Sequence, residues 1–439
     1  MNFRDSRWDR DLVVYNLVKD IPLPRMALVS QRFEDVSIND IPSAVRKEFD
    51  RPEISSRIKK DMSIAVTAGS RGIAHIALII KEVVWNLKRL GASPFVIPAM
   101  GSHGGGTAEG QAGVLSGFGI TEDYIGAPIL ATMETVCIGK TENGEPVLID
   151  KYAAEADGIV VVGRIKPHTA FRGRYESGLF KMMAIGLGKL AGANVCHSEG
   201  FGGMAKQVEK FGNAVLRNAN ILFGIGIVEN AFDDTALIEA VPSELIPERE
   251  PDLLMLAKTL LPKLFIQDFD ILITDSLGKN FSGAGQDPNI TGSYMSPYAS
   301  GGPSVKRYVV LDMSEESHGN PLGIGRADIT TKRFFDKIDF DSAYPNALTC
   351  GLLMGVKVPL VVNNDRLAVQ GAIKSLPEPC RSNPRIIRIE NSSQVERILV
   401  SESLEEEIAK HPEMTLMSSF KEMPFDENGN FSHCDYKTY

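Results

Sequence analysis

The residues that decide the fold run from position 157 to position 203 and read DGIVVVGRIKPHTAFRGRYESGLFKMMAIGLGKLAGANVCHSEGFGG. The apolar run at residues 159–162 is too short for a helix and rich in β-branched side chains, which favours a buried strand. Pro167 biases Lys166 towards an extended conformation, so the chain turns there and His168 follows the carboxyl end of the strand. Ligands of open α/β sheets bind at that end, and the stretch therefore predicts a functional site.

A lysine and a second histidine follow on the same stretch. Residues 178–190 are predicted as one helix carrying Lys181 between two apolar side chains, and His197 comes sixteen residues after that lysine. A buried lysine loses its proton more easily and becomes a nucleophile or a covalent anchor, whereas a lysine that reaches solvent has neither property. His197 is interpreted as a metal ligand, a base or a hydrogen-bonded core residue.

The region before this stretch has the pattern of a βαβ unit. A strand at residues 62–67 leads into the turn AGSRG, which contains Ser70 and Arg71. An amphipathic helix at residues 73–90 and a strand at 94–98 follow, and the chain then opens into GSHGGGT, with His103, Gly104 and Gly105. Parallel strands end at one edge, so both loops are expected beside His168. The glycine loop is interpreted as an anion cradle or as a simple turn.

The second half of the chain repeats the α/β pattern after a predicted hairpin at residues 135–149 and a helix ending near residue 261. A strand at 270–274 leads into a long glycine-rich loop at 275–289. Loops of this length after a buried strand are more often functional than not. The predicted fold class is α/β, with two α/β domains, 1–265 and 266–439, facing each other across an active-site cleft.

Several charged and polar side chains are assigned to substrate contact. They are cationic side chains that attract a carboxylate or phosphate, together with polar side chains of the long loop. The set is Arg172, Arg174, Lys279, Asp287 and Asn289.

Composition excludes several classes of protein. The chain has 439 residues, 23% of them charged, and a net charge of -9, which argues against a nucleic-acid partner. Its five cysteines are scattered, so a disulfide framework and a zinc ribbon are not expected. The longest apolar tract is interrupted by Lys81, Glu82 and Lys88, and the first residues lack an apolar signal core. We expect a cytoplasmic protein with no membrane contact.

The combination of His103, His168, Lys181 and His197 resembles the nickel-dependent lactate racemase family. The most specific element of the resemblance is the spacing of Lys181 and His197. It implies that Lys181 is joined to a nickel-pincer nucleotide, that His197 completes the coordination of nickel, and that His103 and His168 are an acid/base pair. Arg71, Ser70, Gly104 and Gly105 are then cofactor-binding residues.

The resemblance implies a racemase or epimerase of a 2-hydroxy acid, either lactate or a larger or sugar-derived acid. Removal of the α-proton beside an ionised carboxylate is difficult, whereas a cofactor can accept the α-hydrogen as hydride while a histidine takes the hydroxyl proton. A second histidine supplies the proton when hydride returns to the other face. Other proteins assemble the cofactor, so recombinant protein can lack it; a homo-oligomer is compatible with the sequence.

Two other functions are considered. A zinc or nickel hydrolase would use His103, His168 and His197 as three metal ligands. A non-catalytic binding protein for a phosphorylated ligand would use Lys181 and the arginines as anion clamps. Neither alternative requires the spacing of Lys181 and His197.

Overall fold

The computed structural model describes residues 11–432 and residue 436, and its contacts divide the chain into two compact units. One unit is Glu34–Leu261, and the other combines the segment ending at Phe33 with the chain from Pro262 onward. The sequence places the boundary after residue 265 and assigns the first 33 residues to the N-terminal domain. In the structure residues 11–33 belong to the C-terminal unit, because their strand β1 (Met26–Gln31) pairs there.

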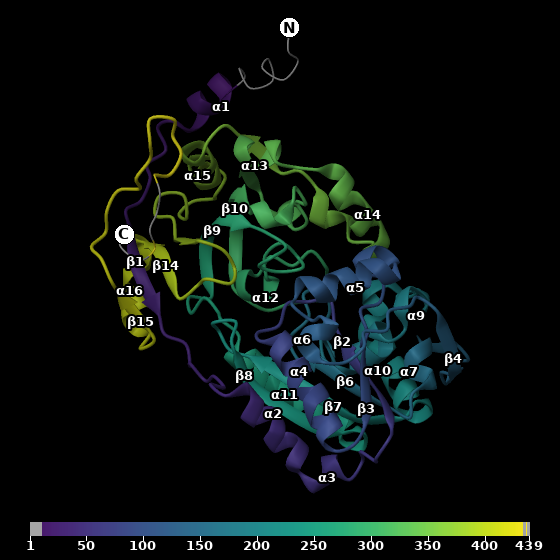
Figure 1. Ribbon diagram of the computed structural model, residues 1–439. Coiled ribbons are helices and arrows are strands. Elements are labelled where there is room, and N and C mark those ends of the chain that lie inside the picture. Colours follow the sequence, from purple (N-terminus) through teal and green to yellow (C-terminus); the bar gives the residue numbers. More distant parts are fainter. Residues whose placement is uncertain (1–10, 433–435, 437–439) are drawn as a thin grey trace. The chain divides into compact units, whose positions relative to one another are not determined.

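The Glu34–Leu261 unit is built on a five-stranded sheet (Figure 1). Its first four strands are parallel, as the βαβ pattern predicts, and the fifth is antiparallel to the fourth. In spatial order the strands are β3 (Ser93–Pro98), β2 (Ser63–Ala68), β6 (Gly158–Arg164), β7 (Ile221–Glu229) and β8 (Thr235–Pro242). The carboxyl ends of β2, β3 and β6 therefore share one edge.

Both faces of this sheet are buried, which explains the continuous apolar runs of its strands. Val66 and Val160 belong to the core on one face, whereas Ala65 and Val161 belong to the core on the other, as the alternation of side chains along a strand requires. The helices that supply apolar side chains to the first face are α2 (Ile41–Asp50) and α4 (Ile76–Arg89), and those that supply them to the second are α10 (Gly200–Asn218) and α11 (Ile246–Leu260).

The helix that carries Lys181 is broken, and the prediction of one helix at residues 178–190 is wrong. The chain forms α8 (Leu179–Lys181), one π-helical turn (Met182–Gly186) and, after a change of direction, α9 (Lys189–Cys196). Lys189 at the break has φ +52°, a left-handed conformation that ends a regular helix. Single π turns inside helices are frequent at functional sites.

Shorter elements complete this unit. The predicted hairpin is confirmed as an antiparallel pair, and the remaining elements are short helices. They are β4 (Thr135–Lys140), β5 (Pro146–Asp150), α3 (Pro52–Ser55), α5 (Ala108–Gly117), α6 (Glu122–Ile125) and α7 (Lys151–Glu155).

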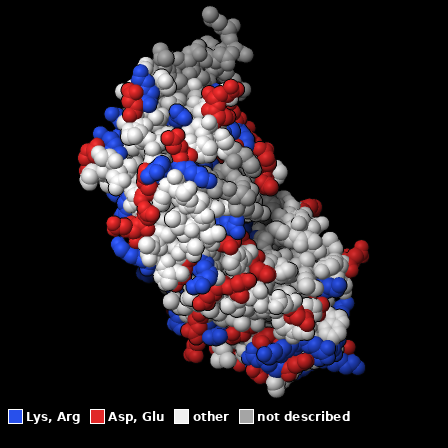
Figure 2. Space-filling view, turned by 90° about the vertical axis from the view of Figure 1, so that its left-hand side faces the viewer, with Lys and Arg blue, Asp and Glu red and all other residues white. Residues whose placement is uncertain are grey.

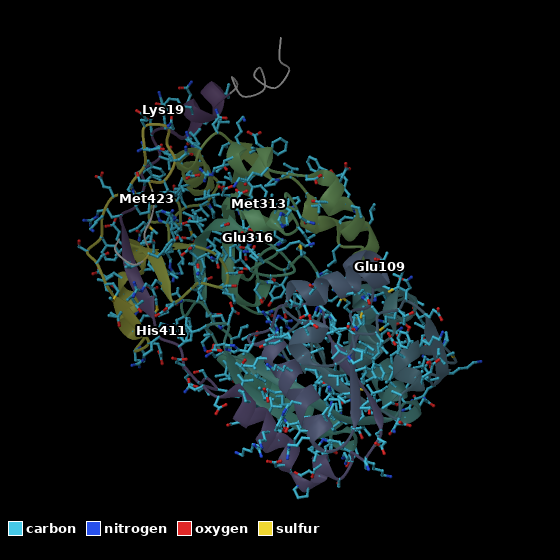
Figure 3. All side chains as sticks on the ribbon, viewed as in Figure 1. Lys19, Glu109, Met313, Glu316, His411 and Met423 are labelled. Carbon is cyan, nitrogen blue, oxygen red and sulfur yellow. The ribbon has the colours of Figure 1, made fainter. Side chains whose placement is uncertain are left out.

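The second unit contains an eight-stranded sheet, in which five strands are parallel and three are antiparallel to their neighbours. In spatial order the strands are β12 (Leu360–Val362), β11 (Ile329–Thr331), β10 (Ser304–Met313), β9 (Asp268–Leu277), β13 (Ile386–Ile389), β14 (Arg397–Ser401), β1 and β15 (Met414–Leu416). The helices are α1 (Asp11–Val18), α12 (Pro288–Thr291), α13 (Lys332–Asp336), α14 (Phe340–Cys350), α15 (Asp365–Lys374) and α16 (Glu405–Lys410). Met423, labelled in Figure 3, joins the core of this unit from the C-terminal segment.

The described surface carries charges of both signs. Lys and Arg alternate with Asp and Glu over the face shown in Figure 2. Within residues 11–432, no single helix is long and apolar enough to cross a membrane. The segments Leu179–Gly186 and Lys189–Cys196 meet that criterion only when they are counted together across a bend of 108°.

Candidate functional site

Three loops meet at the edge of the five-stranded sheet where β2, β3 and β6 end. Ser70, in the loop after β2, hydrogen-bonds through Oγ to Nδ1 of His103, in the loop after β3. This contact confirms that the two loops lie together, as the parallel order of the strands predicts. Arg71 is exposed beside them, with its guanidinium 3.4 Å from the carbonyl oxygen of Ser70.

The loop of His103 is held by a buried lysine and a buried glutamine. Nε2 of Gln111, in α5, donates to the carbonyl oxygens of Gly101 (2.9 Å) and His103 (3.2 Å). Oε1 of Gln111 accepts in turn from Nζ of Lys189 (3.2 Å), and that Nζ lies 2.8 Å from Oδ2 of Asp150. Both side chains of the ion pair are fully buried. A relay of three side chains therefore fixes the backbone beneath His103.

The two glycines assigned to cofactor binding occupy different surroundings. Gly104 has φ +65°, and a Cβ there would lie 2.7 Å from the backbone nitrogen of Gln111, so packing against α5 requires a glycine. Gly105 also has a positive φ, but a Cβ there would meet nothing within 4 Å. Only Gly105 thus presents its backbone to open space.

His168 lies in a loop whose two ends are tied together. Lys166 and Ser177 exchange backbone hydrogen bonds of 3.0 and 3.1 Å, which closes the loop directly before α8. Inside it, Nδ1 of His168 accepts from the backbone N–H of Ala170 at 3.0 Å. Burial and the positive charges of Lys181, Arg172 and Arg71 lower the pKa of His168 well below 6.5. The imidazole is therefore neutral at neutral pH.

A buried carboxylate supports this loop. Oε2 of Glu176 accepts a hydrogen bond from the backbone N–H of His168 at 2.6 Å, and Oε1 accepts one from Nζ of Lys258 at 2.7 Å. Arg172 donates to the carbonyl oxygen of His168 at 2.5 Å and lies 3.3 Å from Glu176. Arg172, assigned from sequence to substrate contact, thus braces the backbone of His168.

Lys181 meets His168 directly. Nζ of Lys181 lies 2.8 Å from Nε2 of His168, and the lysine side chain is half-buried. Burial, with a contribution from the charge of Arg71, lowers the pKa of Lys181 to about 8. The first turn of its helix is capped by Glu250, which accepts the backbone N–H of Phe180 at 2.9 Å. Burial raises the pKa of Glu250 to about 8.

His197 ends α9 with a defined tautomer. Its Nδ1 lies 2.7 Å from the carbonyl oxygen of Ala193, which can only accept, so Nδ1 carries the proton and Nε2 carries a lone pair. Burial lowers the pKa of this imidazole. The rings of His197 and His168 both lie 6.4 Å from the ring of Phe201. Both imidazoles thus lie near the same aromatic ring, and Lys181 contacts one of them, His168.

Other sequence-assigned residues lie elsewhere. Arg174 is exposed and donates to the carbonyl oxygen of Pro247 at 3.1 Å. Lys279, Asp287 and Asn289 belong to the second unit. There Asp287 caps α12 by accepting the backbone N–H of Asn289 at 2.9 Å, and the backbone N–H of Lys279 donates to Ser317 at 3.0 Å.

Four supporting residues were missed from the sequence. Glu176 carried a signal, since it is a lone carboxylate in a cationic loop four residues after Arg172. Gln111 and Lys189 contact each other although 78 positions separate them in the sequence. Glu250 lies 70 positions from Phe180, whose backbone N–H it accepts. Local sequence patterns therefore carry no information about these contacts.

Two observations describe the potential metal ligands of this site. Within residues 11–432 and 436, no group of three or more His, Cys, Asp or Glu side chains is arranged to hold a metal ion. Cys196, next to His197, is buried, and burial raises the pKa of its thiol to about 12, so it is a poor anionic ligand.

The chain was compared with solved structures, curated proteins and family models. The lactate racemase apoprotein from Thermoanaerobacterium thermosaccharolyticum is similar in structure with a TM-score of 0.44 and 16% identity, over 63% of this chain and 68% of that one. No curated protein matches the chain by sequence. The family model described as lactate racemase N-terminal domain matches residues 27–205, which include His103, His168, Lys181 and His197. Residues 27–205 of this chain are thus similar to the N-terminal domain of lactate racemases.

Proposed function

We propose that this protein is a racemase or epimerase of a 2-hydroxy acid, with a nickel-pincer nucleotide attached to Lys181. The observation that carries the proposal is the contact of Lys181 with a neutral imidazole, His168, beside a second imidazole, His197, whose Nε2 is available to a metal. The family match over residues 27–205 supports the reaction class.

The chemistry of Lys181 and His197 fits a nickel-pincer nucleotide. Lys181 has a pKa of about 8, so an appreciable fraction of its amine is neutral near pH 7 and can form a covalent bond. A metal-bound histidine usually donates its other ring N–H to a carbonyl or carboxylate, as His197 does to Ala193. Nickel(II) accepts an imidazole together with soft donors, and one protein ligand then suffices. When bound, the nucleotide supplies an electrophilic carbon that accepts a hydride.

The side chains of the protein manage the protons and the charge. His103 and His168 are the acid/base pair: one accepts the hydroxyl proton of the 2-hydroxy acid and the other returns a proton after inversion. Ser70 orients His103 through Nδ1, and Ala170 orients His168 through Nδ1, so Nε2 is the nitrogen assigned to proton exchange on both rings. Arg71, exposed at the same edge, attracts the carboxylate of the substrate.

Intact mass and nickel analysis of protein produced together with a cofactor-making system tests the proposal. Wild type is expected to carry an added mass and nickel, and Lys181→Ala is expected to carry neither. His197→Ala is expected to keep the added mass and lose nickel. Lys151→Ala, which removes a partly exposed lysine paired with Glu134, serves as the matched control and should resemble wild type.

A deuterium experiment tests the reaction itself. A 2-hydroxy acid deuterated at the α-carbon should racemise with retention of deuterium, because hydride leaves and returns within one site. Loss of deuterium to water would contradict the mechanism, and an unmodified wild-type protein from the co-production experiment would contradict the cofactor assignment. Tight binding of a phosphorylated ligand without turnover would instead favour the binding protein.

A further inference from the structure

We infer that His168 stabilises the neutral amine of Lys181 by donating its Nε2–H to Nζ, so that Lys181 is a nucleophile before anything is attached to it. The inference rests on the proposed function only for the identity of the group that Lys181 takes. It assigns His168 a positioning role in attachment in addition to the proton exchange proposed above.

The hydrogen bonds of His168 fix the direction of its contact with Lys181. The backbone N–H of Ala170 can only donate, so Nδ1 of His168 must present a lone pair at 3.0 Å. A neutral imidazole with its lone pair on Nδ1 carries its proton on Nε2. At 2.8 Å, Nε2–H then donates to Nζ, which can accept only if the amine is uncharged.

The surroundings of Lys181 favour the same state. Among residues 11–432 and 436, no carboxylate forms an ion pair or hydrogen bond with its Nζ. The titratable and charged groups that act on it are Arg71 from the loop after β2, His168 and His197 from the two neighbouring segments, and Cys196 from α9. Arg71 disfavours a second positive charge, and the Cys196 thiol, with a pKa of about 12, is neutral near pH 7.

A neutral amine can attack an acyl carbon directly. The lone pair of Nζ forms a nitrogen–carbon bond, the bond from carbon to the leaving group breaks, the leaving group departs with that electron pair, and the proton lost from nitrogen passes to water. The product nitrogen is amide-like and has no basic lone pair. It no longer accepts from His168, and Nε2–H of the imidazole becomes available to exchange a proton with the substrate.

Acetylation of the full-length apoprotein with p-nitrophenyl acetate measures this reactivity. The ester loses p-nitrophenolate, and peptide mass spectrometry reports the rate at each lysine. Lys181 is expected to react at pH 7 at least roughly tenfold faster than partly exposed Lys151, whose pKa the hydrogen bond to Glu134 raises. The rate at Lys181 should rise with a midpoint near pH 8. A rate at or below that of Lys151, or a midpoint near 10.5, would overturn the inference.

Two substitutions at one position test the direction of the hydrogen bond. His168→Gln retains an N–H donor and is expected to keep Lys181 reactive, within about threefold of wild type. His168→Glu places a carboxylate beside Nζ, stabilises the ammonium ion and is expected to slow acetylation at pH 7 about tenfold or more. His75→Gln, which removes an exposed histidine paired with Asp234, is the matched control and should not change the rate.

The tautomer of His168 can be measured directly in the wild-type protein, so this test does not require a variant to keep its reactivity. In ¹⁵N-histidine spectra, His168 should show a protonated Nε2 and an unprotonated Nδ1, with the signals assigned by their absence in His168→Gln. The opposite tautomer would refute the inference. A reactive Lys181 that gains no mass from a cofactor-making system would refute the proposed function alone, whereas an added mass on an amine with ordinary reactivity would refute only this inference.

Discussion

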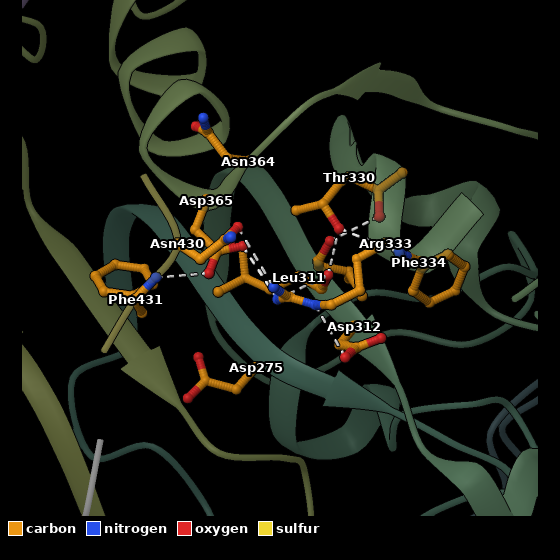
Figure 4. A network of polar contacts seen from close by, with 12 residues as sticks. Asp275, Leu311, Asp312, Thr330, Arg333, Phe334, Asn364, Asp365, Asn430 and Phe431 are labelled. Carbon is orange, nitrogen blue, oxygen red and sulfur yellow. Dashed lines mark hydrogen bonds and ion pairs between the residues drawn. The ribbon is translucent and has the colours of Figure 1, made fainter. Parts of the chain in front are cut away.

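The site around Lys181 and the polar network of the second unit differ in whether their cationic side chains are paired with carboxylates. Both lie near the carboxyl ends of parallel strands. In the second unit, Arg333 bridges Asp312 (3.0 Å) and Asp365 (3.1 Å), and Asp365 accepts the backbone N–H of Phe431 at 2.9 Å (Figure 4). Around Lys181, positive and potentially positive groups gather with one another, and the Nζ of the lysine contacts an imidazole.

The consequence is a difference in protonation. In the network, Arg388 is almost buried and remains charged because it makes two hydrogen bonds, of 2.6 and 2.9 Å, with Asp275. In the part of the chain that the structure describes, no carboxylate pairs with the side chain of Lys181 or His168, and burial lowers the pKa values of both groups. Paired charges stabilise a fold, whereas unpaired groups retain reactivity. The comparison therefore separates a structural network from a candidate active site.

The largest effect is expected at the paired lysine eight residues from Lys181. Lys189→Met should lower the free energy of unfolding by about 4 kcal/mol, because Asp150 remains buried without its partner. Urea unfolding followed by circular dichroism measures the loss. The double variant Asp150→Asn/Lys189→Met should recover part of it, and equal losses in the single and double variants would show that the ion pair is not the cause.

Arg388→Met should cost about 3 kcal/mol, since it leaves Asp275 partly buried and also removes a cation–π contact at 3.6 Å from the ring of Phe431. Hydrogen exchange should accelerate in β9, β10 and β13 and stay unchanged in β2, β3 and β6. Equal acceleration in both sheets would mean that the two units do not differ as described.

Glu250→Gln should remove a pH-dependent contribution to the free energy of unfolding on the order of 2 kcal/mol. The pKa of the folded carboxyl is raised from 4.5 to about 8, so the folded state binds the extra proton between these values. The contribution of this carboxyl group to the free energy of unfolding is greatest below pH 4.5 and is lost as pH rises towards 8. Unfolding of wild type and variant should be compared at pH 5 and pH 8; parallel losses would contradict the raised pKa.

The smallest effect is expected at Lys181 itself. Lys181→Met should change stability at pH 7 by no more than about 1 kcal/mol, in the stabilising direction, because no ion pair is lost and a desolvated amine is removed. The folded pKa of about 8 lies below the usual 10.5, so wild type should gain on the variant as pH rises from 8 to 10.5. A strong destabilisation at pH 7 would make Lys181 a structural residue like Lys189.

Much of the site follows from the sequence because parallel strands place their ends together. The strands before Ser70, His103 and His168 are short apolar runs with a glycine or proline after them, and that local pattern was sufficient to place the three loops at one edge. The same reasoning failed for the helix of Lys181. Its apolar sequence continues through Gly186 and Gly188, but the backbone of Lys189 is left-handed and its side chain forms a buried ion pair with Asp150.

The sequence by itself determined which residues carry reactive groups and that the strands before them end at one edge of a sheet, since both depend on short-range pattern and chain connectivity. Only the tertiary structure decided the protonation, the tautomer and the hydrogen-bond partners of each group. Ala170 and Ala193 select the tautomers of His168 and His197, Glu250 reaches α8 from α11, and β1 pairs in the other unit. These contacts depend on the distances and desolvation that packing creates, and no local pattern encodes them.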